Sequence, residues 1–474
     1  MLEHNSVMHS RPSMAAPIPI ATYALDTVAL AILSNALLHL VLLDETTLPN
    51  IHQQGNTLLQ SLNAVVYAIY GLRLIFNTAV KSQLRILINN DRLFCFPVAV
   101  LLGLAFASML WSGEPQVTFR RAFALAGTTL VGIYLALRYT PRQFLMLLLG
   151  VSAVFALSSI AMVMLWPQKG LMQVSTVFAD VHKGRWRGIF VHKNHLASLM
   201  AVGIVTATGL LTGRGKQLLA AGLMLLVCLG LLLLAESLTS LLATATALLA
   251  ISIVRMLPGR QTMRREILLA LTPLVLLIVS VVLYQSAQNK PDASTPVTTA
   301  QVTETANSAS SNSQHTPLQR EGFRRDAGAT GRLNMWRWCW DAIQQQPLLG
   351  YGYGTFWRTG GPAERVWKHT RFRLPHAHNG WIDLALQLGL PATLLTAGWM
   401  LWLGARLLRG VYQDGEHEAQ TAAIALFGLW VCLNVLNLAE SVVFRQNDVL
   451  SALLLSVAVF TALPRKTHFE STFR

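Results

Sequence analysis

The chain has 474 residues, of which 53% are hydrophobic and 12% are charged. An ordinary soluble domain carries roughly a quarter of its residues as Asp, Glu, Lys or Arg, so this composition excludes that class. The formal net charge of +15 does not indicate a nucleic-acid partner, because the cytoplasmic loops of a membrane protein collect Lys and Arg. The sequence therefore predicts an all-α integral membrane protein.

Long apolar runs predict twelve membrane-spanning helices, since about 20 apolar residues cross a bilayer core. Lys and Arg are concentrated in alternate short loops. Because cytoplasmic loops are enriched in these residues, the pattern predicts that both termini lie in the cytoplasm. We expect residues 1–285 to hold spans one to nine, 286–377 to form a large periplasmic loop, and 378–474 to hold three spans and a cytoplasmic tail. In chain order the predicted spans are 18–43, 58–80, 94–112, 120–138, 143–165, 195–212, 217–234, 237–254, 267–285, 378–405, 420–439 and 447–463.

The fifth and sixth predicted spans are joined by an external loop that is basic against the usual charge distribution. Guanidinium groups make paired, charge-assisted hydrogen bonds to phosphate, so basic residues at the outer face indicate an anionic ligand. The alternative is that these side chains extend to lipid headgroups. The basic residues of this loop are Lys169, Lys183, Arg185, Arg187 and Lys193.

The large periplasmic loop has two parts of different composition. Residues 290–319 are rich in Ser, Thr, Ala and Gln and predict a flexible linker, because they offer little apolar surface to bury. Residues 320–377 predict an ordered helical part that begins with an amphipathic helix at Gly331–Gln346. Arg332 and Arg337 lie on this helix five residues apart, so at most one of them should face a site.

Two histidines precede the tenth span in the segment LPHAHNGWIDLALQLGLPA. His376 and His378 are two residues apart, whereas helical metal pairs are usually four apart, and the external loops contain no closely spaced carboxylate pair. The sequence therefore predicts no metal site. A histidine that is neutral near pH 7 can instead act as a general base for an acceptor hydroxyl. The alternative for each histidine is a structural hydrogen bond to a backbone carbonyl.

Four segments together resemble the O-antigen ligase family, whose superfamily also contains polymerases. They are RGIFVHKNHLA from Arg187, GRLNMW from Gly331, DAIQQQPLLGYGYGTF from Asp341 and HAHNGWIDLALQLGLP from His376. The resemblance implies a GT-C-like glycosyltransferase of the bacterial inner membrane with its active site on the periplasmic side. It further implies inverting transfer of a glycan from undecaprenyl pyrophosphate to a lipid A-core sugar, without a metal or another cofactor.

Carried over to this sequence, the resemblance implies a role for each residue that matches a family motif. His378 would be the general base, and Arg187 and Arg332 would bind the pyrophosphate. Arg185 is an alternative to Arg187, because the Arg-Trp-Arg run permits both alignments. Further substrate-binding candidates are His376 and Asn379.

Other functions remain open from the sequence. A polysaccharide polymerase and a protein O-oligosaccharyltransferase of the same superfamily would use the same donor and the same site residues. A transporter of lipid-linked substrates would need charged or broken-helix sites near the bilayer midplane. The middle of the predicted spans carries almost no charge, which favours an enzyme.

Overall fold

The computed structural model describes residues 18–36, 56–173, 182–256, 271–279, 281, 329–370, 373–412 and 417–463. Within these ranges the secondary structure is helical except for an isolated bridge between Leu171 and Trp186. The predicted linker 290–319 lies outside the described residues. The labelled helices are α1 (Ile20–Leu33), α4 (Thr57–Phe76), α5 (Thr78–Asn90), α6 (Arg92–Ala107), the 3₁₀ turn η2 (Ser108–Leu110), α7 (Pro115–Arg138), α8 (Pro141–Leu165), α9 (Pro167–Gly170), α10 (Lys193–Leu210), α11 (Lys216–Leu234), α12 (Leu238–Met256), α15 (Ala329–Gln345), α16 (Glu364–Thr370), α17 (Gly380–Val411), α18 (His417–Asn437) and α19 (Val449–Ala462).

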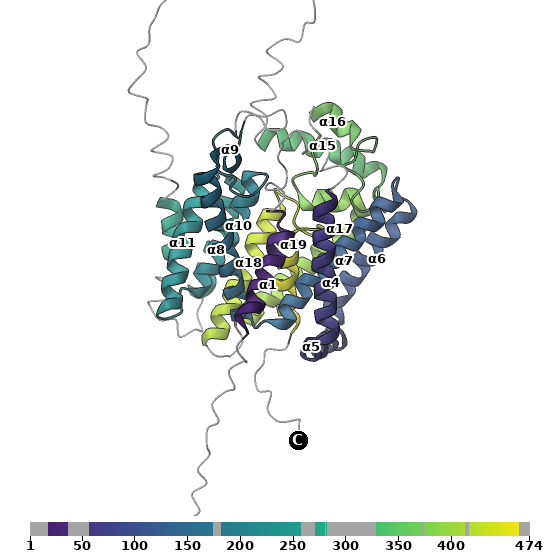
Figure 1. Cartoon of the computed structure of the whole chain (residues 1–474). Helices are drawn as coiled ribbons and strands as arrows, with labels where there is room; N and C mark the ends of the chain where they lie inside the picture. Colours follow the sequence, from purple (N-terminus) through teal and green to yellow (C-terminus); the bar gives the residue numbers. More distant parts are fainter. Residues whose placement is uncertain are drawn as a thin grey trace, which may run out of the picture.

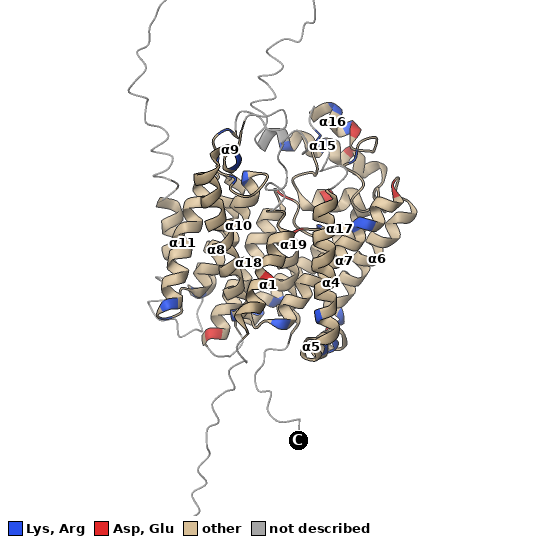
Figure 2. Ribbon diagram, in the orientation of Figure 1, with Lys and Arg blue, Asp and Glu red and all other residues tan. Residues whose placement is uncertain are grey.

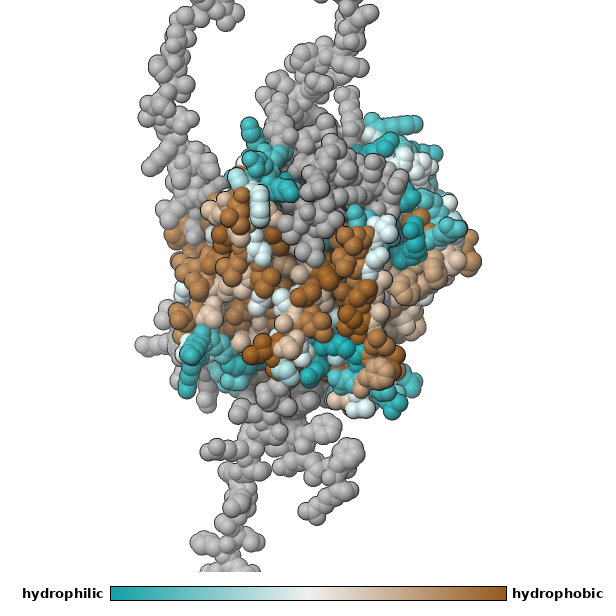
Figure 3. Space-filling view, viewed as in Figure 1, coloured by the Kyte–Doolittle hydropathy of each residue, from teal (hydrophilic) through white to brown (hydrophobic). Residues whose placement is uncertain are grey.

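The surface of the bundle has the pattern of a membrane protein. Figure 3 shows hydrophobic residues across the middle of the face in view, and Figure 2 shows most of the visible charged residues near the two ends of the bundle. Seven described helices are long and apolar enough to cross a membrane: α4, α6 with η2, α8, α11, α12, α17 and α18. The all-α, multi-pass membrane class is therefore confirmed. The count of twelve spans stays a prediction, because part of the first and ninth predicted spans lies outside the described residues.

The helix α10 forms the centre of one half of the bundle. It contacts α8, α11, α12 and α18, and all its residues except His195 are buried. Glycines allow the close approach of its neighbours. A Cβ atom at Gly203 would lie 2.7 Å from the sulfur of Cys228, and one at Gly209 would lie 2.4 Å from the Cβ atom of Ala425. This packing fixes the first residues of α10 at the upper end of the bundle, as drawn in Figure 1.

A second, smaller core caps the upper end of the bundle. The helix α15 packs on α17, and α16 packs on α15 (Figure 1). The core of this cap includes Met335, Cys339, Phe356, Trp367 and Leu386, all of which are buried. The cap therefore places α15 beside the beginning of α17.

The tenth predicted span is a helix with a break in it. Within α17, Gly389 has φ 83° and ψ 172°, which is not helical. A Cβ atom there would lie 2.2 Å from the carbonyl oxygen of Leu348, so only glycine permits this approach. The N–H group of Leu390 donates to the carbonyl of Pro347 at 2.7 Å. The segment that follows α15 therefore fills the break and joins the cap to the bundle.

Candidate active site

The two histidines of the cap lie in a tight turn before α17. His378 has φ 50°, in the left-handed region that L-residues seldom adopt. Its N–H group donates to Nδ1 of His376 at 3.1 Å. Asn379 caps α17, because its side-chain oxygen accepts from the N–H groups of Trp381 and Ile382. Backbone strain of this kind persists where the surroundings fix it, often at functional sites. The turn therefore holds the side chain of His378 in one direction.

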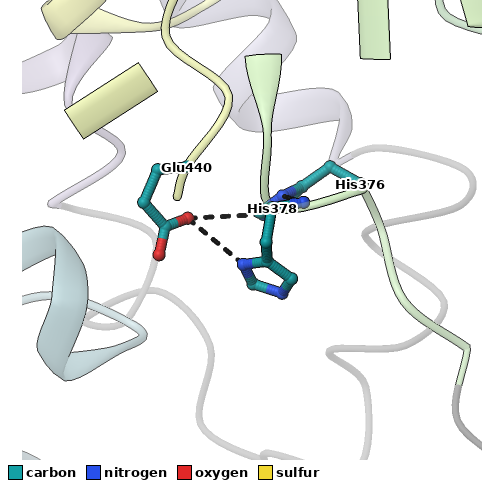
Figure 4. Close-up of side chains that lie close together, drawn as sticks. All are labelled: His376, His378 and Glu440. Carbon is teal, nitrogen blue, oxygen red and sulfur yellow. Dashed lines mark hydrogen bonds and ion pairs between the residues drawn. The ribbon is translucent and has the colours of Figure 1, made fainter. Parts of the chain in front are cut away.

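Glu440 faces both histidines from the segment that follows α18. Figure 4 shows its carboxylate directed at the two imidazoles. Its Oε2 atom lies 3.4 Å from Nδ1 of His378 and 3.9 Å from Nε2 of His376. Its Oε1 atom accepts a 2.8 Å hydrogen bond from the side chain of Asn194, at the beginning of α10. The side chain of His378 is 23% exposed, against 10% for Glu440, so His378 is the more accessible group of this pair.

The protonation states of these groups follow from burial and from their neighbours. Burial, and then the charges of His378 and Arg445, lower the pKa of His376 well below its usual value. Burial alone would raise the pKa of Glu440, but its interactions with His378, and then with His376, outweigh burial and hold this pKa well below its usual range. The site therefore contains an ionised carboxylate beside the neutral His376.

Arg332 and Arg337 lie on different sides of α15. The guanidinium group of Arg332 is partly buried and donates to the carbonyl of Ala439 at 3.3 Å, directly before Glu440 in the chain. Arg337 is exposed. The structure thus brings Arg332, and not Arg337, to the segment that carries Glu440.

Two further cations lie near Arg332. Arg185 pairs with the carboxylate of Glu236 at 2.7 Å, and the ammonium group of Lys193 donates to the carbonyl of the same residue at 2.8 Å. Burial, followed by the charges of Lys193, Arg185 and Arg332, lowers the pKa of His182 to about 4. Lys193 directly precedes Asn194, whose side chain donates to Glu440, and Arg332 donates to the carbonyl of the adjacent Ala439. Because Arg185 shares Glu236 with Lys193, these contacts bring the three cations to the side of the histidine turn on which Glu440 lies.

Arg187 has different surroundings from Arg185. Its Nε atom donates to the carbonyl of Lys169 at 2.8 Å, and the residue is 1% exposed. Its backbone N–H group donates to the carbonyl of Gly170, so Arg187 is held against the end of α9. The side chain of Arg185 is 28% exposed. The family arginine can be aligned with Arg185 or with Arg187. Only the alignment with Arg185 gives an accessible guanidinium group near Lys193 and Arg332.

Glu440 is a residue that the sequence argument missed. It lies in a short polar break between two apolar runs, far in sequence from the histidines. The available signal was an acidic group at the predicted outer end of a span, where polar residues mark functional sites. Asn194 was also missed, although it lies within the segment that includes Arg185 and Arg187.

The side chains of His376, His378 and Glu440 form a cluster of the kind that can bind a cation. Ligand atoms of His376, His378 and Glu440 lie within 4.8 Å of one another. The prediction of no metal site rested in part on the lack of a carboxylate pair; the fold brings one carboxylate, that of Glu440, to the histidines from the segment that follows α18. Two imidazoles and a carboxylate are ligands that zinc accepts.

Residues 221–397 match the protein-family model described as O-antigen ligase. The chain contains an O-antigen ligase family domain. The matched segment holds Arg332, His376 and His378, whereas Arg185 and Glu440 lie outside it and reach the same site through the fold. The match is compatible with a ligase and with a polymerase. No curated protein matches the chain.

Proposed function

We propose that this protein is an O-antigen ligase of the bacterial inner membrane. It would transfer an undecaprenyl-pyrophosphate-linked glycan to a hydroxyl group of a lipid A-core sugar at the periplasmic face, with inversion and without a metal. The observation that carries the proposal is the His378–Glu440 pair. His378 lies within the segment that matches the O-antigen ligase family, and Glu440 is contacted by Asn194, next to Lys193, and follows Ala439, which Arg332 contacts. The family domain and the apolar helices support the coarser statement of a membrane enzyme of the ligase type.

His378 has the geometry of a general base. Its Nδ1 atom is 3.4 Å from Glu440, and its second ring nitrogen is directed away from Glu440 (Figure 4). In the proposed step this second nitrogen takes the proton of the acceptor hydroxyl as the hydroxyl oxygen attacks the anomeric carbon. The carboxylate of Glu440 then stabilises the imidazolium that forms. General-base assistance of this kind contributes about 10²–10⁴-fold to a rate.

The three cations would stabilise the negative charge of the leaving group, the lipid-linked diphosphate. The bond between the anomeric carbon and the pyrophosphate oxygen breaks as the new glycosidic bond forms, so negative charge develops on the lipid-linked diphosphate. In the proposed step, Arg332 and Arg185 would make paired hydrogen bonds to its phosphate oxygens, and Lys193 would add a third positive charge. Lys193 is also the first residue of α10, and helix N-termini attract anions.

A reconstituted transfer assay tests the chemistry directly. Purified protein in lipid nanodiscs would receive an undecaprenyl-pyrophosphate glycan and lipid A-core, with and without excess EDTA. We expect equal transfer in both samples, because the proposed step uses only side chains. Loss of transfer in EDTA that is restored by zinc or magnesium would overturn the metal-free step and favour a cation at His376, His378 and Glu440.

The acceptor distinguishes the ligase from its relatives, since the proposed donor site is common to all of them. In a deletion strain, a ligase predicts loss of all long lipopolysaccharide bands together with accumulation of lipid-linked glycan. Retention of core plus a single repeat would indicate a polymerase instead. Unchanged lipopolysaccharide with unglycosylated periplasmic protein would indicate a protein O-oligosaccharyltransferase.

A further inference from the structure

We propose that Asp383 is a positioning residue that sets the distance between His378 and Glu440. This inference rests on the proposed function of that pair. Asp383 lies in the first turn of α17 and is 4% exposed. Its carboxylate accepts hydrogen bonds from both chain segments that form the site, which are far apart in sequence.

The first contact fixes the histidine turn. The N–H group of Ala377 donates to both carboxylate oxygens of Asp383, at 3.0 and 3.2 Å. Ala377 lies between the two histidines and directly precedes His378, whose backbone is in the left-handed region. A charge-assisted hydrogen bond at this position opposes relaxation of the turn to an ordinary conformation.

The second contact fixes the acidic segment. The hydroxyl group of Ser441 donates to Oδ2 of Asp383, and Ser441 directly follows Glu440 in the chain. The carboxylate of Asp383 thus holds the backbone N–H group of Ala377, next to His378, and the side chain of Ser441, next to Glu440. Movement of either segment alone would break one of these hydrogen bonds.

Tryptophan side chains complete the support. The indole N–H group of Trp357 donates to Oδ1 of Asp383 at 2.7 Å. The indole N–H group of Trp336, on α15, donates to the carbonyl of Ala377 at 2.8 Å. Both the N–H and the carbonyl group of Ala377 are therefore held, which leaves the histidine turn little freedom to shift.

The expected effect of losing Asp383 is on turnover rather than on donor binding. A misplacement of about 1 Å at a reacting group can reduce a rate about 10²-fold. Arg185, Lys193 and Arg332, which would hold the donor, have no hydrogen bond to Asp383 among those found in the described residues. The KM for the lipid-linked donor should therefore stay close to that of the wild type.

The test is a graded series of variants assayed for kcat and for the donor KM, with each rate divided by the amount of folded protein. Asp383→Asn should lower kcat about 10²-fold, because the amide cannot accept from all of these donors. Ser441→Ala and Trp357→Phe each remove one hydrogen bond and should lower kcat less. The matched control is Trp367→Phe, since the Trp367 indole N–H group donates to the carbonyl of Leu374 and not to Asp383.

The outcomes separate this inference from the function on which it rests. Should Asp383→Asn fail to fold, Ser441→Ala and Trp357→Phe still carry the test, because each removes a single donor. Wild-type kcat in the two single-donor variants, or a loss no larger than that of Trp367→Phe, would overturn the positioning role. Full activity of His378→Ala would instead overturn the proposed function itself.

Discussion

Two buried carboxylates of the bundle, Asp26 and Glu440, have different partners. In α1, Asp26 accepts from the hydroxyl groups of Tyr70 at 2.6 Å and Tyr139 at 2.5 Å and pairs with Arg73. In the segment that follows α18, Glu440 accepts one 2.8 Å hydrogen bond from a side-chain amide and otherwise faces imidazoles at 3.4 and 3.9 Å. The partners of Asp26 are phenol and guanidinium groups, whereas Glu440 lies beside imidazoles, the side chains most often used as general bases.

The surroundings of Arg73 complete the contrast. Its guanidinium group lies 5.0 Å from the ring centre of Tyr70 and 4.7 Å from that of Tyr134. Cation–π contacts and an ion pair therefore neutralise the charge that Asp26 brings into an apolar helix. Burial of a charged group is thus not enough to identify a functional site, and the chemistry of its partners decides.

The largest effect should come from His378→Ala. Loss of the general base should lower transfer by about 10²–10⁴-fold without unfolding the protein. His376→Ala should be milder, because His376 braces the turn through the N–H group of His378 and does not take the proton. Transfer rates of purified variants, divided by folded protein, check this. Equal losses from the two substitutions would mean that the base is misassigned or that the histidines act together.

Lysine substitutions at the cations should have the next largest effect. Lysine supplies one compact charge in place of a planar fork, so Arg332→Lys and Arg185→Lys should each reduce transfer, by up to about 10²-fold. Arg337→Lys is the matched control on the exposed side of α15 and should keep most activity. Arg187→Lys should affect folded yield more than the rate per folded protein, because Arg187 is held at the carbonyl of Lys169.

Near-normal activity of Arg332→Lys and Arg185→Lys would contradict the role of the arginines in binding pyrophosphate. Both lysine and arginine side chains reach lipid headgroups, so that result would favour simple anchoring at the membrane surface.

The smallest effect concerns acid stability. Burial is the first cause that lowers the pKa values of His376 and His192, so the folded protein binds fewer protons than the unfolded chain below about pH 6.5. Stability should therefore fall with falling pH, by up to about 1.4 kcal/mol per pH unit for each such histidine. Thermal unfolding in detergent between about pH 7 and pH 5 measures this.

A matched variant attributes the acid dependence to one histidine. The side-chain oxygen of asparagine in His376→Asn can accept the same backbone hydrogen bond but does not titrate in this range. The variant should show a shallower fall in unfolding temperature than the wild type. An identical fall would place the acid dependence elsewhere in the protein.

The sequence predicted the parts of the site that lie in continuous segments. The apolar runs predicted the helices, and the segments around Arg185, Gly331 and His376 predicted which residues to consider. The break at Gly389 could not be predicted, because it depends on the backbone of Leu348 packing into α17. The sequence accordingly predicted the tenth span at 378–405 without a break at Gly389 being identified.

Contacts between residues far apart in the sequence decide which of the candidate residues lie at the site. The two arginines of the Arg-Trp-Arg run are equivalent in composition, and only packing against Lys169 or pairing with Glu236 distinguishes them. Glu440 and Asp383 gain their importance from contacts between α17 and the end of α18, which no local pattern encodes.

We expect Glu440 to serve the reaction and Asp26 to serve the fold. The most direct test measures transfer rate per folded protein and unfolding temperature together for Glu440→Gln and Asp26→Asn. We predict that Glu440→Gln lowers transfer by about 10²-fold with little change in unfolding temperature. Asp26→Asn should destabilise the protein by about 3 kcal/mol or more and leave the transfer rate per folded molecule unchanged. Parallel losses of rate and stability in both variants, or wild-type transfer by Glu440→Gln, would contradict this account.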